Sequence, residues 1–77
     1  MKEQILSCLT DKKKGENNKK MLTFCREPKL YTEIQQSHLK GDIQDTILAL
    51  QKAKGLSFAN GKYFSTPLGL EVLQSLP

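Results

Sequence analysis

The sequence contains no apolar run that approaches the roughly 20 residues needed to cross a membrane as a helix. The N-terminal stretch MKEQILSCLTDKKK is also unlike a secretory signal, because Glu3 and Gln4 interrupt its short apolar patch and no small-residue cleavage site follows. We therefore expect a protein that has no membrane partner and that stays in the cytoplasm.

Residues that bind metals are scarce. Cys8 and Cys25 are seventeen positions apart, outside every short-spaced metal or redox motif, and His38 is the only histidine. The ligands of a zinc site are therefore missing, and we expect no metal and no cofactor. The two cysteines are better explained as small core-facing residues at helical positions. The sequence leaves a disulfide between them open, although a cytoplasmic location opposes one.

The chain also lacks the side-chain groupings of an enzyme. It offers no paired-carboxylate, Ser/His or metal arrangement, and the lone His38 cannot supply one. We therefore expect a protein that is not an enzyme, and the sequence gives no sign of a small-molecule ligand.

The residues that are present suffice for one folded domain. Of the 77 residues, 38% are hydrophobic and 26% are charged, which is the composition of a globular rather than a disordered chain. This length is near the lower limit for domains that fold without disulfides or metals. We therefore treat residues 1–77 as a single domain.

Positive charge is concentrated near the N-terminus. The formal net charge is +4, and residues 1–20 carry six lysines against three acidic residues, whereas residues 21–77 carry six basic and five acidic residues. The segment 11–20, DKKKGENNKK, is therefore expected to be a basic loop in front of an almost neutral body. Such a run is either a solvated connector or a phosphate-binding arm, and composition alone favours the connector.

The spacing of apolar residues predicts several helices in succession. The first spans residues 2–10 and gathers its apolar side chains, Leu6 among them, around one side. The second begins with Asn17 or Asn18 as its cap and ends before Pro28, because the residue before a proline is pushed out of the helical region.

A short third helix lies in KLYTEIQQ, with Leu30 expected to face inward. The clearest helix is DIQDTILALQKAK, which starts at Asp42 and places Ile47 and Leu50 on one apolar face. We expect Gly55 to end this helix as its C-terminal cap.

The segment FANGKYFSTPLG predicts a hairpin that leads directly into another helix. Asn60-Gly61 is the strongest two-residue signal for a type I′ turn, since both turn residues need positive φ. A two-residue turn pairs Phe58 with Tyr63 on one face and leaves Phe64 on the other face.

Just after the hairpin, Thr66 can cap a helix and Pro67 suits the first helical position. The sequence LGLEVLQSL then continues with leucines at helical spacing. The predicted fold class is mainly α with a small β-hairpin (α+β).

The order of these elements resembles the winged helix-turn-helix family of DNA-binding domains over about residues 18–76. ILALQKAKGL is similar to the end of a family recognition helix, and STPLGLEVL to the family's Leu-Thr-Pro-x-Gly start of the helix after the wing. Two departures are Lys54, an extra residue between the Ala and the Gly, and Ser65, which replaces the usual leucine. The resemblance implies a winged helix-turn-helix with an extra N-terminal helix, residues 2–10.

The resemblance also assigns roles. LYTEIQQ corresponds to the first helix of the helix-turn-helix, SHLKG to the turn, residues 42–54 to the recognition helix and residues 56–65 to the wing. In this architecture the recognition helix enters the major groove, while the wing and the helix ends contact the backbone. The residues expected to contact DNA lie on the recognition helix, just before it, on the wing and on the basic loop: His38, Lys40, Gln44, Asp45, Leu48, Lys52, Lys62, Lys12, Lys13 and Lys14.

Two functions of different classes are compatible with these features. The first is sequence-specific binding of double-stranded DNA by a small transcriptional regulator, which the basic loop and the isoelectric point near 9.2 favour. The second is a winged-helix protein–protein interaction module without direct DNA binding, which the near-neutral recognition segment favours. We put DNA binding first.

We further expect a homodimer joined through residues 2–10 and 68–76. The N-terminal helix and LGLEVLQSL offer more apolar residues than one core-facing stripe can hold, and two copies can bury them around a two-fold axis. The rival arrangement folds the first helix back onto its own domain.

Overall fold

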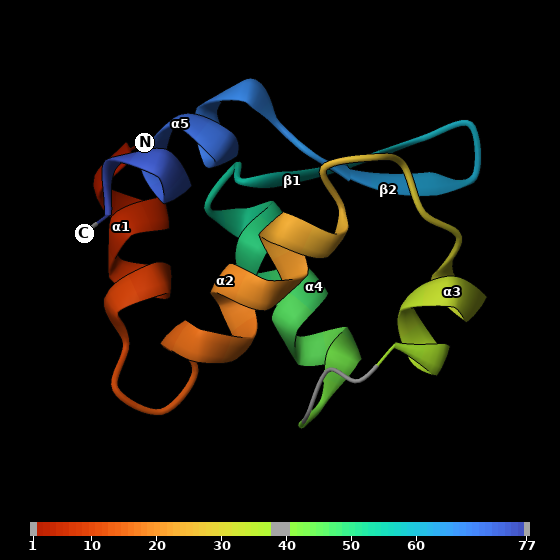
Figure 1. Cartoon of the computed structure of the whole chain (residues 1–77), viewed down its shortest axis with the longest axis horizontal. Coiled ribbons are helices and arrows are strands. Elements are labelled where there is room, and N and C mark those ends of the chain that lie inside the picture. The colour runs from red at the N-terminus through yellow and green to blue at the C-terminus, as the bar shows by residue number, and fades with distance from the viewer. Residues whose placement is uncertain (1, 38–40, 77) are drawn as a thin grey trace.

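The computed structural model describes residues 2–37 and 41–76, and within these residues the chain forms five α-helices and a two-stranded antiparallel sheet (Figure 1). The elements in chain order are α1 (Lys2–Thr10), α2 (Gly15–Phe24), α3 (Tyr31–Gln36), α4 (Ile43–Lys52), β1 (Leu56–Ala59), β2 (Lys62–Ser65) and α5 (Pro67–Ser75). The predicted α+β class is confirmed. In this described part no helix is long and apolar enough to cross a membrane.

The apolar core lies where α1, α2, α4 and α5 meet, because α2 packs against each of the other three helices. Each apolar side chain buried there contributes roughly 1.5–3 kcal/mol to folding. The largest fully buried side chains are Ile5, Leu9, Met21, Leu22, Cys25, Ile34 and Leu50. Since α1 supplies two of them, this helix belongs to the core of its own chain.

Helix α1 buries a narrower stripe than the sequence predicts. Ile5 and Leu9, four residues apart, are buried, whereas Leu6, at the edge of the same side, is 42% exposed. The start of α1 is held to α5 by an ion pair, in which Lys2 Nζ lies 2.8 Å from Glu71 Oε1. Both side chains are exposed, so the pair adds little stability.

Helix α2 begins earlier than predicted, at Gly15 rather than with Asn17 or Asn18 as its cap. Asn18 lies within the helix, is almost fully buried, and donates from Nδ2 to the Cys8 carbonyl oxygen at 2.8 Å. Only residues 11–14 of the predicted basic loop therefore connect two helices, and residues 15–20 are helical.

Helix α3 follows a one-residue strand pairing. The backbones of Lys29 and Tyr63 exchange both hydrogen bonds, each 2.8 Å long, which adds Lys29 to the outer edge of β2. The Leu30 amide then donates to Glu33 Oε1 at 2.8 Å, and Ile34 is the one residue that α3 buries completely. Leu30 itself is 44% exposed, so the prediction that it faces inward is wrong.

Helix α4 has the predicted start but a different end. The Asp42 carboxylate accepts from the amides of Gln44 and Asp45, as expected for an N-cap. At the other end the left-handed residue is Lys54, with φ of 71°, and not Gly55. Gly55 instead donates to the Leu50 carbonyl oxygen at 2.8 Å, which completes a Schellman-type ending.

Replacing Lys54 with glycine is expected to raise the stability of the domain. A side chain in the left-handed region costs about 1 kcal/mol relative to glycine, and Lys54 is exposed, so the substitution removes strain without opening a cavity. Thermal unfolding followed by circular dichroism measures the effect, and Lys62→Gly, within a strand, is the control that should destabilise. An unchanged or lower melting temperature for Lys54→Gly would contradict the strain.

The hairpin has the predicted register and turn. Phe58 pairs with Tyr63, Ser57 with Phe64, and the turn residues Asn60 and Gly61 have φ values of 53° and 77°. Both turn residues therefore take the positive φ that a type I′ turn requires.

Ser65 explains one departure from the winged-helix pattern. This residue is 6% exposed, and its hydroxyl donates to the Leu22 carbonyl oxygen at 2.6 Å. Its backbone amide donates to the Cys25 carbonyl oxygen at 2.8 Å. The bond to Cys25 comes from the backbone, so a leucine would keep it, but only the serine hydroxyl can satisfy the Leu22 carbonyl oxygen near the end of α2.

Helix α5 starts as predicted, with the Thr66 hydroxyl accepting from the Gly69 amide at 2.9 Å and Pro67 in the first turn. The first turn also approaches the chain leaving α4. A Cβ atom on Gly69 would overlap the Gly55 carbonyl oxygen, which is already the acceptor for the Thr66 amide at 3.0 Å. Glycine at position 69 therefore permits this close contact.

Candidate nucleic-acid interface

Four of the predicted contact residues form an exposed stripe on α4. Ile47 and Leu50 face the core, so the opposite side of the helix is open to solvent. We call this surface the α4 stripe, and it consists of Gln44, Asp45, Leu48 and Lys52, all of them exposed. The stripe carries one positive and one negative charge, so its own net charge is zero.

Leu48 is the most exposed large apolar residue of the stripe, at 56%. A single exposed leucine is common on protein surfaces, and here it is the one apolar side chain among the polar residues of the stripe. Two predicted contact residues, His38 and Lys40, lie outside the described residues.

The basic loop is ordered by Asp11. Its Oδ1 accepts hydrogen bonds from the amides of Lys13 and Lys14, at 2.8 and 2.9 Å. These bonds, from Lys14 first and Lys13 second, lower the pKa of the Asp11 carboxyl below its usual value. The side chains of Lys12, Lys13 and Lys14 are exposed, so the loop presents three positive charges on a defined backbone.

The loop and the start of α4 lie at the same end of the molecule. A Cβ atom built on Gly41 would be 3.0 Å from the side-chain Nδ2 of Asn17, which belongs to the first turns of α2 just after the loop. Figure 1 shows this end at the bottom of the view, with the β1–β2 hairpin on the opposite side. The structure thus brings the first turns of α2, which follow Lys12–Lys14, close to Gly41 just before α4, and the exposed Lys62 lies apart from them on the hairpin.

Three other residues on the hairpin side were not predicted as contacts. Lys54 is exposed at the end of α4, and Lys29 places its Nζ 5.3 Å from the centre of the Phe24 ring. Phe58 is 51% exposed on β1. The sequence did mark Lys54 as an extra residue, but periodicity cannot show that Phe58 extends beyond the core.

Both cysteines are free thiols in the described structure. Cys25 is buried, as expected, and burial raises its pKa to about 11. Its thiol therefore favours folding below the ordinary pKa of 9.0, and this contribution is lost as the pH rises towards 11. Cys8 is half-buried, and burial followed by the nearby Asp11 raises its pKa as well. Both thiols stay protonated near neutral pH, which makes them poor nucleophiles.

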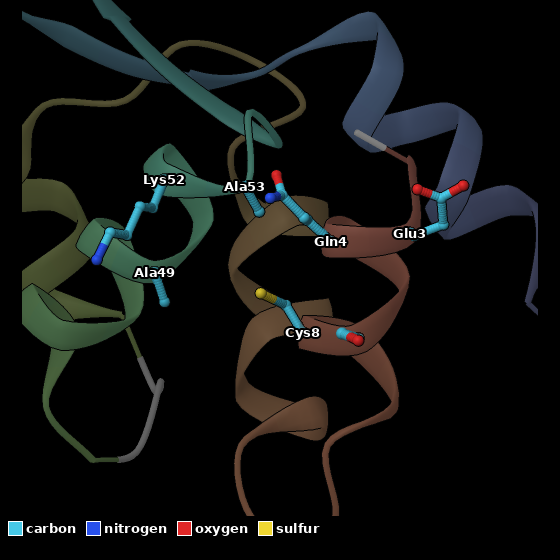
Figure 2. A pocket seen from close by; sticks show the side chains of 7 residues that line it. Glu3, Gln4, Cys8, Ala49, Lys52 and Ala53 are labelled. Atoms are coloured by element: carbon cyan, nitrogen blue, oxygen red, sulfur yellow. The ribbon is translucent and has the colours of Figure 1, made fainter.

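A groove of about 540 Å³ lies between α1 and α4 (Figure 2). Its lining residues are mostly small or neutral: Glu3, Gln4, Ser7, Cys8, Ala49, Lys52 and Ala53. Figure 2 shows Gln4 and Cys8 directed towards α4, whereas Glu3 and Lys52 point away from the groove. Among residues 2–37 and 41–76, no three metal-binding side chains are grouped together.

Comparisons of the chain with protein-family models, with curated proteins and with solved structures found no match.

Proposed function

We propose that this chain is a winged helix-turn-helix domain that binds double-stranded DNA and acts as a small transcriptional regulator in the cytoplasm. The topology supports the fold proposal: α2, the paired residue Lys29, α3, α4 and the β1–β2 hairpin follow one another in the order of that family. Lys29 pairs with β2. In a three-stranded winged-helix sheet the first strand would occupy this same place beside β2.

The observation that carries the DNA proposal is the α4 stripe with a basic loop at the same end of the molecule. The helix presents side chains that can read base edges, and Lys12–Lys14 can contact phosphates beside them. Phosphate contacts supply most of the sequence-independent affinity for DNA, and they require positive charge. The α4 stripe has no net charge, and the lysines of the loop would supply it.

Each residue of the stripe has a chemical role in this proposal. Gln44 can bond an adenine through two hydrogen bonds, and Leu48 can contact a thymine methyl group. Asp45 repels phosphate but can accept from the cytosine amino group. Lys52 can contact guanine or phosphate, and Lys62 on the hairpin can contact phosphate.

The alternative is a winged-helix protein–protein interaction module. The specific observation in its favour is Leu48, 56% exposed on a stripe with no net charge. An exposed leucine beside balanced charges suits the centre of a protein interface as well as it suits a thymine methyl group.

Amide chemical shifts of the ¹⁵N-labelled chain, titrated with a random-sequence duplex at low salt, test the proposal. We expect the largest changes at the α4 stripe, at residues 12–14 and around Lys62, because these groups would approach the duplex. Changes confined to α1 and α5, or no changes with the protein folded, would remove the DNA proposal and favour the protein-partner alternative.

The homodimer through residues 2–10 and 68–76 stays a prediction. Ile5, Leu9 and Val72 are buried within a single chain, so α1 already folds back onto its own domain, and only Leu6 remains as a large exposed apolar residue of α1. A dimer would double the basic footprint and read two half-sites. Sedimentation equilibrium at micromolar concentration measures the outcome: twice the chain mass of 8.7 kDa supports the dimer, and 8.7 kDa excludes it.

A further inference from the structure

The hairpin and α3 form a row of three aromatic rings. The Phe58 and Tyr63 rings, paired across the hairpin, have centroids 4.6 Å apart at an interplanar angle of 53°. Tyr63 in turn lies 6.3 Å from Tyr31 at the start of α3, at 54°. These separations are those of favourable aromatic pairs, so each ring supports the orientation of the next.

Phe58 is the exposed end of this row. Tyr63 and Tyr31 are partly buried against the core, whereas 51% of the Phe58 side chain is accessible to solvent. Because strand pairing and the Tyr63 ring fix its position, Phe58 offers an oriented aromatic surface that loses little rotamer freedom on contact.

The charged residues of the hairpin segment are all lysines: residues 53–66 contain Lys54 and Lys62 and no acidic residue. Lys62 pairs with Ala59 next to the turn, so its side chain leaves the hairpin on the face opposite to Phe58. Lys29 pairs with Tyr63 on the other edge of β2. Two acidic residues belong to the segment that flanks Lys29: Glu27 is exposed, and Glu33 of α3 accepts a hydrogen bond from the Leu30 amide. An exposed aromatic ring on a hairpin whose charged residues are lysines has the chemistry of elements that bind single-stranded nucleic acid, where bases stack and phosphates pair with cations.

We propose that Phe58 stacks on an unpaired nucleobase, so that the hairpin binds single-stranded DNA next to the duplex held by α4. This inference deepens the proposed function, because the duplex part of such a junction depends on the DNA interface described above. Stacking of one base on an aromatic side chain contributes about 1–3 kcal/mol, which corresponds to roughly 5- to 150-fold in affinity.

A tryptophan at position 58 reports stacking directly, since the chain contains no tryptophan of its own. We expect the fluorescence of Phe58→Trp to be quenched when oligo(dT) is added at low salt. Leu6→Trp is the matched control, because Leu6 is an apolar residue of similar exposure, at 42%, on α1 at the opposite side of the molecule (Figure 1). Its fluorescence should not change with oligo(dT).

The second measurement compares a blunt duplex with the same duplex carrying a single-stranded dT overhang, by fluorescence anisotropy. The wild-type chain should bind the overhang duplex at least 5-fold more tightly, in line with about 1 kcal/mol or more from stacking. Phe58→Ala should lose this gain and keep its affinity for the blunt duplex within about twofold. Leu6→Ala should keep both affinities, and circular dichroism should show that both variants are folded.

Each outcome decides the inference. Equal binding of both duplexes by the wild-type chain would overturn base stacking, and so would an overhang gain that survives Phe58→Ala. Either result would leave duplex binding intact and make the Phe58 ring a candidate protein contact. Quenching and overhang binding without any blunt-duplex binding would support stacking and overturn duplex binding instead. Binding to neither DNA would overturn both proposals.

Discussion

Gly69→Ala is expected to lower the free energy of unfolding by about 3 kcal/mol, the upper range for overpacking a close-packed site. The added methyl group would overlap the Gly55 carbonyl oxygen and lie 3.0 Å from the Gly55 Cα. Both are backbone atoms, so relief requires α5 to move away from the end of α4. That movement would stretch the hydrogen bond that the Thr66 amide donates to the Gly55 carbonyl oxygen.

Helix propensity alone predicts the opposite sign, because alanine is favoured over glycine inside a helix by about 1 kcal/mol. The steric cost is larger, and for a domain of this size 3 kcal/mol lowers the melting temperature by roughly 12–24 °C. Gly55→Ala is the matched control, since its Cβ would meet Ile5 at an ordinary distance of 3.5 Å. A melting temperature for Gly69→Ala equal to or above that of the wild-type chain would contradict the close contact of α5 with Gly55.

The second large effect concerns the basic loop. Replacing Lys12, Lys13 and Lys14 together with alanine should weaken binding to every duplex sequence. The slope of log affinity against log salt concentration should become shallower by about 2.7, that is, by about 0.9 per lost phosphate contact. The loop should keep its shape, because Asp11 holds it through backbone amides and not through the lysine side chains.

Two controls separate phosphate contact from base reading. Lys2→Ala, at the far end of α1 where the lysine pairs with Glu71, should leave the salt dependence unchanged. Gln44→Ala should leave binding to random DNA unchanged and cost about 1–3 kcal/mol on a preferred sequence only. If the triple lysine variant keeps the wild-type salt dependence, the loop is a solvated connector.

The parts of the fold that were predicted correctly depend on local chemistry. A type I′ turn requires positive φ at both turn residues, and Asn60 and Gly61 both have it. This turn sets the register of the two strands. Thr66 caps α5 because its side-chain oxygen can reach an amide three residues later, within the same short segment. Tertiary contacts were not needed for these predictions.

The incorrect predictions depend on contacts between distant segments. Leu30 has the spacing of a core residue, but α3 buries only the side that faces other elements, and Leu30 lies outside that side. Asn18 resembles a helix cap in sequence, yet its amide bonds to the Cys8 carbonyl of another helix. Gly55 resembles a C-cap, but Lys54 takes the positive φ and position 55 lies close to α5.

For the candidate site, helical periodicity was sufficient to predict which α4 residues are exposed. Periodicity could not predict that the basic loop is ordered by Asp11, or that Asn17 in the first turns of α2 lies near Gly41. It also missed the exposed Phe58, because a strand residue on the core face is exposed only when the strand extends past the core.

The most direct test of DNA binding by this chain is its affinity for random-sequence duplex DNA measured between low and near-physiological salt. The exposed lysines at positions 12, 13, 14, 52 and 62 predict that log affinity falls linearly with log salt, with a slope of about −2.7 to −4.5 for three to five phosphate contacts. No detectable binding at low salt, with the protein shown to be folded, would contradict the proposed function.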